Sequence, residues 1–98
     1  MNIRFHDETL RVCFEQSSRA TRRGGPVVGG SYLRAVQRIL NVASFAELRT
    51  FLSLRIHPLT GDRRGQWAMS LHDRWRLVFV LVDAETIEIQ EVSNHYDD

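Results

Sequence analysis

The side chains of this 98-residue chain that are best suited to chemistry are two histidines, an arginine and a tyrosine: His57, His95, Arg76 and Tyr96. An imidazole titrates at about pH 6.5, so each histidine can take or give a proton at neutral pH. A guanidinium carries a permanent positive charge that stabilises a phosphate in the transition state. Metal-free cleavage of RNA by the ribose 2′-hydroxyl needs a base, an acid and a cation. We therefore predict that these four side chains form a phosphodiester-cleaving site.

Further polar side chains around this set are expected to bind the substrate. Arg55, Arg63 and Arg64 can hold phosphate oxygens through paired hydrogen bonds, and Asn94 directly precedes His95. A metal site is not expected, because the histidines stand at positions 6, 57, 72 and 95 without the short spacing of zinc ligands. No cofactor is expected either.

The segments that must position these residues form a predicted antiparallel sheet. Alternating apolar residues predict strands at about residues 66–71, 74–82 and 86–93, joined by tight turns. In such a meander the start of one strand lies opposite the end of the next. Arg76 should therefore meet residues 94–96 at one edge of the sheet.

The N-terminal half predicts a short strand at residues 2–5 and helices after it. The first helix spans about residues 8–16, with Asp7 as its N-cap. Ser31 or Gly30 can cap a second helix, in which four apolar residues recur at core spacing: Leu33, Val36, Leu40 and Ala43. Ser44 and Glu47 form a capping box for a third, short helix.

Residues 17–30 are predicted to be a flexible loop rich in glycine and arginine. Four glycines, a proline and three serine or threonine residues interrupt any helical period there. Its arginines at positions 19, 22 and 23 belong either to a solvated loop or to a basic arm that touches RNA. The expected architecture is a single α+β domain over residues 1–98, with N-terminal helices packed on one face of a mostly antiparallel C-terminal sheet.

Composition narrows the class of protein and its compartment. No apolar run approaches the roughly 20 residues of a membrane-spanning helix, and the lone Cys13 cannot form an internal disulfide, so we expect a cytoplasmic protein. All 13 basic residues are arginines at or before Arg76. Residues 1–76 carry 13 arginines and six acids, a charge of +7, whereas residues 77–98 carry six acids and no base, a charge of −6. Such asymmetry indicates a nucleic-acid face, unless folding brings the two halves side by side.

The segment LRIHPLTGDRRGQWAMSLHDRWRLVFVL, residues 54–81, resembles the conserved block of HigB-like toxins, the plasmid-maintenance killer branch of the RelE/ParE superfamily. The shared pattern is His-Pro-Leu, Gly-Asp-Arg, Gly-x-Trp and Trp-Arg, here at residues 57–59, 61–63, 65–67 and 75–76. The resemblance implies a small RelE-like fold and a ribosome-dependent messenger RNA endoribonuclease, the toxin of a type II toxin-antitoxin system. It also implies a cognate antitoxin, such as a HigA-like helix-turn-helix protein.

The resemblance carries over two functional positions. His57 matches the motif histidine, and Arg76 matches the strand arginine that related toxins place on the scissile phosphate. The chain departs from many relatives at its end, where Asn94-His95-Tyr96 replaces Asp-Tyr-His, and at Thr60, where relatives often have lysine.

Two alternative functions remain open on sequence alone. A ParE-like toxin would keep the scaffold and inhibit a topoisomerase by binding it, and a catalytically silent module would bind RNA without cutting it. The presence of His57 and His95 favours the nuclease. In each case a partner is expected, because helices on one face of a small sheet leave the other face open.

Overall fold

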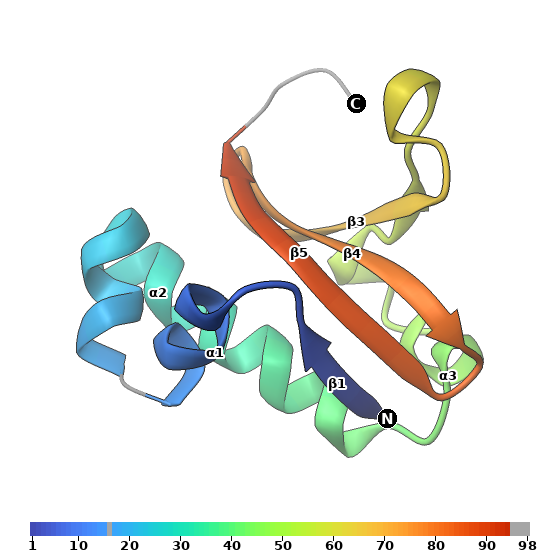
Figure 1. Cartoon of the computed structure of the whole chain (residues 1–98), viewed down its shortest axis with the longest axis horizontal. Helices are drawn as coiled ribbons and strands as arrows, with labels where there is room; N and C mark the ends of the chain where they lie inside the picture. The colour runs from blue at the N-terminus through green and yellow to red at the C-terminus, as the bar shows by residue number, and fades with distance from the viewer. Residues whose placement is uncertain (16, 95–98) are drawn as a thin grey trace.

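A computed structural model describes residues 1–15 and 17–94, with the backbone alone for residues 13–15 and 17–25. The described chain is a curved sheet with helices packed against one face (Figure 1). The elements in chain order are β1 (Asn2–Phe5), α1 (Glu8–Glu15), α2 (Ser17–Asn41), α3 (Phe45–Leu48), η1 (Leu52–Leu54), β2 (His57–Pro58), η2 (Gly61–Arg63), β3 (Gln66–His72), β4 (Trp75–Asp83) and β5 (Thr86–Asn94).

The sheet has five strands in the order β1-β5-β4-β3-β2. Strands β3, β4 and β5 form the predicted antiparallel meander, and each boundary lies within one residue of its prediction. The strand predicted at residues 2–5 is also confirmed, and it pairs parallel to β5. Strand β2 was not predicted; its two residues pair antiparallel with β3 at the opposite edge. The α+β class and the mostly antiparallel sheet are therefore as expected.

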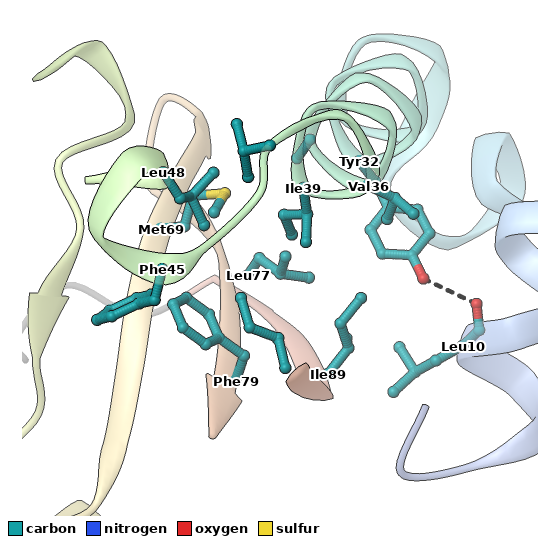
Figure 2. Packing of buried hydrophobic residues seen from close by; sticks show 13 residues of the cluster. Leu10, Tyr32, Val36, Ile39, Phe45, Leu48, Met69, Leu77, Phe79 and Ile89 are labelled. Atoms are coloured by element: carbon teal, nitrogen blue, oxygen red, sulfur yellow. Dashed lines mark hydrogen bonds between the residues drawn. The ribbon is translucent and has the colours of Figure 1, made fainter. Parts of the chain in front are cut away.

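The core lies between the helices and the sheet (Figure 2). Leu77 and Phe79 of β4 and Ile89 of β5 are fully buried, together with Ile39 of α2 and Leu48 of α3. These side chains come from every layer, so the core fixes the helices to one face of the sheet.

Two predicted helix caps are present. The backbone N–H of Leu10 donates to the Asp7 carboxylate at 3.0 Å at the start of α1. Ser44 caps α3, since its hydroxyl accepts from the N–H of Glu47 at 3.3 Å. The Glu47 carboxylate in turn accepts from the N–H of Ala43 at 3.3 Å.

The prediction of a loop at residues 17–30 is wrong, because the backbone there is helical and continues through Pro26 into the rest of α2. A proline costs about 3 kcal/mol and a glycine about 1 kcal/mol in a helix interior. Burial of apolar side chains offsets part of this cost, because Val28, Tyr32 and Val36 recur every four residues and all three are buried. The Tyr32 hydroxyl also donates to the Leu10 carbonyl at 2.8 Å, which ties α2 to α1 (Figure 2). The side chains of the three arginines at positions 19, 22 and 23 lie outside the described residues.

The buried face of α2 is also rotated from the predicted one. Of the four residues expected at the core, only Val36 is fully buried, whereas Leu40 and Ala43 are exposed. The buried face consists instead of Tyr32, Ala35, Val36, Ile39 and Val42. The stripe through Tyr32 and Ile39 continues upstream to Val28, which is also buried.

Candidate active site

The candidate site lies on what we call the outer face, the side of β3, β4 and β5 that points away from the helices. Directly paired residues point to the same side of a sheet, so the register identifies its members. One row across the strands consists of Ser70, Arg76 and Ser93. The next row consists of His57, Ala68, Val78 and Glu91.

Arg76 is the central charge of the outer face. It stands at the second position of β4 between two neighbouring strands, and its residue is only 8% exposed. Its direct partners across the strands are the serines Ser70 and Ser93. The sheet therefore places a guanidinium, a group that can bind an anion through paired hydrogen bonds, at the centre of this face.

His57 belongs to the same face, two strands away from Arg76. It pairs with Ala68 at the β2 edge of the sheet. Neighbouring strands of a sheet lie about 4.8 Å apart. Its ring Nδ1 lies 2.9 Å from the Arg55 carbonyl oxygen. A carbonyl can only accept, so Nδ1 carries the proton in this hydrogen bond, and in neutral imidazole Nε2 then carries the lone pair.

A β-bulge brings Glu91 and Ser93 to the outer face. In β5, Ile87 and Ile89 point into the core opposite Leu81 and Phe79. The register then shifts, so that Glu91 pairs with Val78, the direct neighbour of Phe79. The shift leaves Gln90 as the extra residue and reverses the alternation after it.

The connection between β2 and β3, residues 59–65, covers part of the outer face. Leu59 is buried against Ala68 and Val78. Arg63 reaches β5, where its Nη2 donates to the Glu91 carboxylate at 2.6 Å. In Figure 1 this connection, drawn in yellow, arches on the far side of the sheet from α2. The outer face is thus bounded by this connection, and not fully open as the sequence suggested.

The remaining predicted site residues have different surroundings. Asn94 is exposed at the end of β5, opposite Trp75 and next to the Arg76 row, so the predicted approach of Arg76 to residues 94–96 is observed for Asn94 alone. Arg55 and Arg64 are exposed, and Arg55 adopts a left-handed backbone with φ of 49°. His95 and Tyr96 lie outside the described residues.

Sequence reasoning missed Glu91, Ser93 and Ser70. Strict alternation from Ile87 assigns both Glu91 and Ser93 to the core face, and only the bulge at Gln90 reverses that assignment. The charge of Glu91 could have indicated the reversal, because a glutamate on the core face of an inner strand would be buried away from water.

Two further properties concern the described part of the chain as a whole. Its histidine, cysteine, aspartate and glutamate side chains form no group of three or more that could hold a metal ion. None of its helices is both long enough and apolar enough to cross a membrane.

Comparison with solved structures identifies the fold. YafQ from E. coli strain BL21(DE3) superposes with a TM-score of 0.61 at 17% identity, covering 96% of this chain and 92% of that one. The YoeB/ParE toxin from Agrobacterium tumefaciens gives 0.59 at 14% identity, covering 98% and 100%. This protein has the fold of the RelE-like toxins. The YoeB dimer from Staphylococcus aureus agrees, with a TM-score of 0.55 at 18% identity and 98% of each chain covered.

Sequence similarity adds a shorter match in the same group of toxins. Over 31 residues the chain is 36% identical to the Endoribonuclease HigB of Proteus vulgaris. That stretch is 32% of this chain and 34% of the relative, so the chain matches about a third of the relative's length. No protein-family model matches the chain. The resemblance to HigB-like toxins that the motifs indicated is thus supported by this short match and by the shared RelE-like fold.

Proposed function

We propose that the protein is the toxin of a type II toxin-antitoxin system and cleaves messenger RNA on the ribosome. The observation that carries the proposal is the outer face, where buried Arg76 lies between two serines and shares one side of the sheet with His57. The RelE-like fold and the 31-residue similarity to an endoribonuclease support it.

In the proposed reaction the ribose 2′-oxygen attacks the adjacent phosphorus. The O2′–P bond forms, the P–O5′ bond breaks, and the products are a cyclic phosphate and a free 5′-hydroxyl. One group must take the proton of the 2′-hydroxyl, and another must give a proton to the departing 5′-oxygen. His57 is suited to the first role through Nε2, because its Nδ1 is held by the Arg55 carbonyl.

The other side chains of the proposed site stabilise charge or position the substrate. Arg76 and Arg63 stabilise the negative charge that grows on the phosphate oxygens. His95 is proposed as the second proton-transfer group, with Tyr96 and Asn94 orienting the substrate and Tyr96 as the alternative base. Arg55 and Arg64 are proposed to bind flanking phosphates, because both are exposed beside the site. No metal or other cofactor takes part in this scheme.

The proposed partners follow from the reaction. The substrate is messenger RNA bound to ribosomes, which gives the protein a cytoplasmic place of action. A cognate antitoxin is expected to silence it. A small helix-turn-helix protein encoded in the adjacent reading frame would support that partner.

The proposal is tested by His57→Asn. The asparagine amide can still donate to the Arg55 carbonyl, but it has no ring nitrogen that can accept a proton. We expect the single-turnover cleavage rate of messenger RNA on purified translating ribosomes to fall by about 10²-fold or more. The melting temperature should stay within a few degrees of the wild-type value. Intact messenger RNA with the wild-type protein, under conditions in which a control toxin cuts it, would refute the proposal.

A ParE-like function is the second candidate, because one structure that shares the fold is described as a YoeB/ParE toxin. In that case the protein inhibits a topoisomerase by binding it, and no bond is broken by the toxin. Replacing His57 and His95 together by alanine separates the two. Growth arrest on expression is abolished if the protein is the nuclease and persists if it is the binder.

A further inference from the structure

The contact between Arg63 and Glu91 has a chemical consequence for the outer face. The two side chains belong to segments 28 residues apart, the connection after β2 and strand β5, and they meet at 2.6 Å between Nη2 and Oε1. Both are about one-third exposed, so the attraction alone contributes little to stability. The main effect of this contact is therefore to fix the position of the Arg63 guanidinium.

Only part of the Arg63 guanidinium is used by this contact. Its Nη2 is bound to Glu91, whereas Nη1 is shielded from solvent and has no hydrogen-bond acceptor among the described residues. A shielded donor without an acceptor is unfavourable, and an arriving anion would relieve that cost. A guanidinium can serve two acceptors at once because its donors form a rigid planar fork.

A second unsatisfied polar group lies nearby on β5. Ser93 is 6% exposed, and its hydroxyl also has no partner among the described residues. It follows Glu91 by two positions on the same face, so the two lie about 7 Å apart along the strand. It is also the direct cross-strand partner of Arg76. The Ser93 hydroxyl thus lies beside Arg76, and the Arg63 guanidinium is bound one row away on the same face.

The bulge at Gln90 explains why these groups are together. Without the register shift, Glu91 and Ser93 would face the core instead of Arg63 and Arg76. Bulges are frequent next to functional sites because they redirect side chains in this way.

We propose that Glu91 is a positioning residue that holds Arg63 so that its free Nη1, together with the Ser93 hydroxyl, completes a phosphate subsite beside Arg76. This inference rests on the proposed function, since it names the part of the same site that binds the RNA backbone. Glu91 itself does not touch the phosphate. It fixes the arginine, and its loss leaves that cation free to swing into solvent.

The test measures binding apart from cleavage. The probe is a short single-stranded RNA with a 2′-O-methyl group on every sugar, which cannot undergo 2′-hydroxyl attack, and its binding is followed by fluorescence anisotropy. We expect Glu91→Ala to weaken binding about tenfold, the loss of one charge-assisted hydrogen bond. Arg63→Lys should have a similar effect, because an ammonium cannot serve Glu91 and a phosphate in the same geometry. Ser93→Ala should weaken binding about threefold.

The matched control is Glu88→Ala. Glu88 lies three residues earlier on β5 and forms an ion pair with the exposed side chain of Arg4, so its loss should change binding less than twofold. A charge-swapped variant, Arg63→Glu with Glu91→Arg, separates positioning from structural bracing. It restores the link between the connection and β5, and we expect wild-type stability with binding still impaired.

Unchanged binding by Glu91→Ala, or binding fully restored by the charge swap, would overturn the inference. These outcomes are distinct from failure of the proposed function. If the wild-type protein binds the probe in a Glu91-dependent way but never cuts messenger RNA on ribosomes, the subsite stands and the nuclease does not.

Discussion

Arg76 and His57 share the outer face, yet the fold holds them by different means. Arg76 stands in the central strand between two paired neighbours, and it is buried. His57 belongs to a two-residue edge strand, and the Arg55 carbonyl orients its ring. The charge proposed to bind phosphate is therefore held within the sheet, whereas the proposed proton-transfer group lies at the edge of the sheet, where the Arg55 carbonyl orients its ring.

This difference makes Arg76→Lys the informative change at the central position. Lysine keeps the charge but lacks the planar pair of donors that can hold two phosphate oxygens. We expect the cleavage rate on translating ribosomes to fall by about 10²-fold, the usual effect of losing one preorganised electrostatic donor. The control is Arg74→Lys in the exposed β3–β4 turn, for which we expect less than a twofold change. If Arg76→Lys is as active as the wild type, the scissile phosphate does not bind at Arg76.

At this scale the sequence predicts one neighbour of Arg76 and misses others. The approach of Arg76 to Asn94 follows from a short turn, because turn length fixes the register of an antiparallel pair. Glu91 and Ser93 could not be placed, because a single extra residue at Gln90 exchanges the two faces of β5. The Arg63–Glu91 contact joins segments far apart in sequence, and no local pattern encodes it.

Among the elements, α2 differs most from its prediction. Glycine and proline propensities describe an isolated helix, and by that measure the segment before residue 31 should not be helical. They do not register that Val28 and Tyr32 are buried against the rest of the fold. The sheet was predicted well because the alternation of apolar residues reports burial directly, which a propensity does not.

The helical state of this segment predicts that Gly30→Ala stabilises the protein. An added Cβ would meet only the end of the Arg34 side chain, at 3.3 Å, which can move aside. Alanine in a helix interior should raise the free energy of unfolding by about 0.5–1 kcal/mol, measured by chemical denaturation.

Gly65→Ala is the matched control for this measurement. Gly65 has a φ of +97°, a conformation that L-residues avoid, so the same change there should lower the free energy of unfolding by about 1 kcal/mol or more. A destabilising Gly30→Ala would mean that residue 30 is not in a helix interior.

On the scale of the whole molecule, the opposed charges of the two ends of the sequence are partly brought together by β5. Glu88 lies 3.4 Å from Arg4 of the parallel strand β1, and Glu91 binds Arg63. The asymmetry is therefore partly internal to the fold, and it does not by itself mark a nucleic-acid face.

Among the described side chains, two surfaces with arginines are candidates for the RNA binding that we propose. One is the outer face, with Arg63 and Arg76. The other is an open hollow of about 380 Å³ beside α2 and α3, whose lining includes Arg34 and Arg38. Arg38 stacks over the Phe51 ring there at 4.5 Å, which leaves its charge on the helical side of the molecule.

The salt dependence of RNA binding distinguishes these two surfaces. Each phosphate contacted by a cation on single-stranded nucleic acid contributes about 0.7 to the slope of log affinity against log salt. The double variant Arg63→Ala with Glu91→Ala removes one cation of the outer face and keeps the net charge of the protein. We expect it to lower the slope by about 0.7. Arg38→Ala changes the net charge by one unit but should leave the slope unaltered, because its cation lies on the helical side. If Arg38→Ala lowers the slope and the neutral double variant does not, RNA crosses the hollow beside α2, and the outer face is not where the backbone binds.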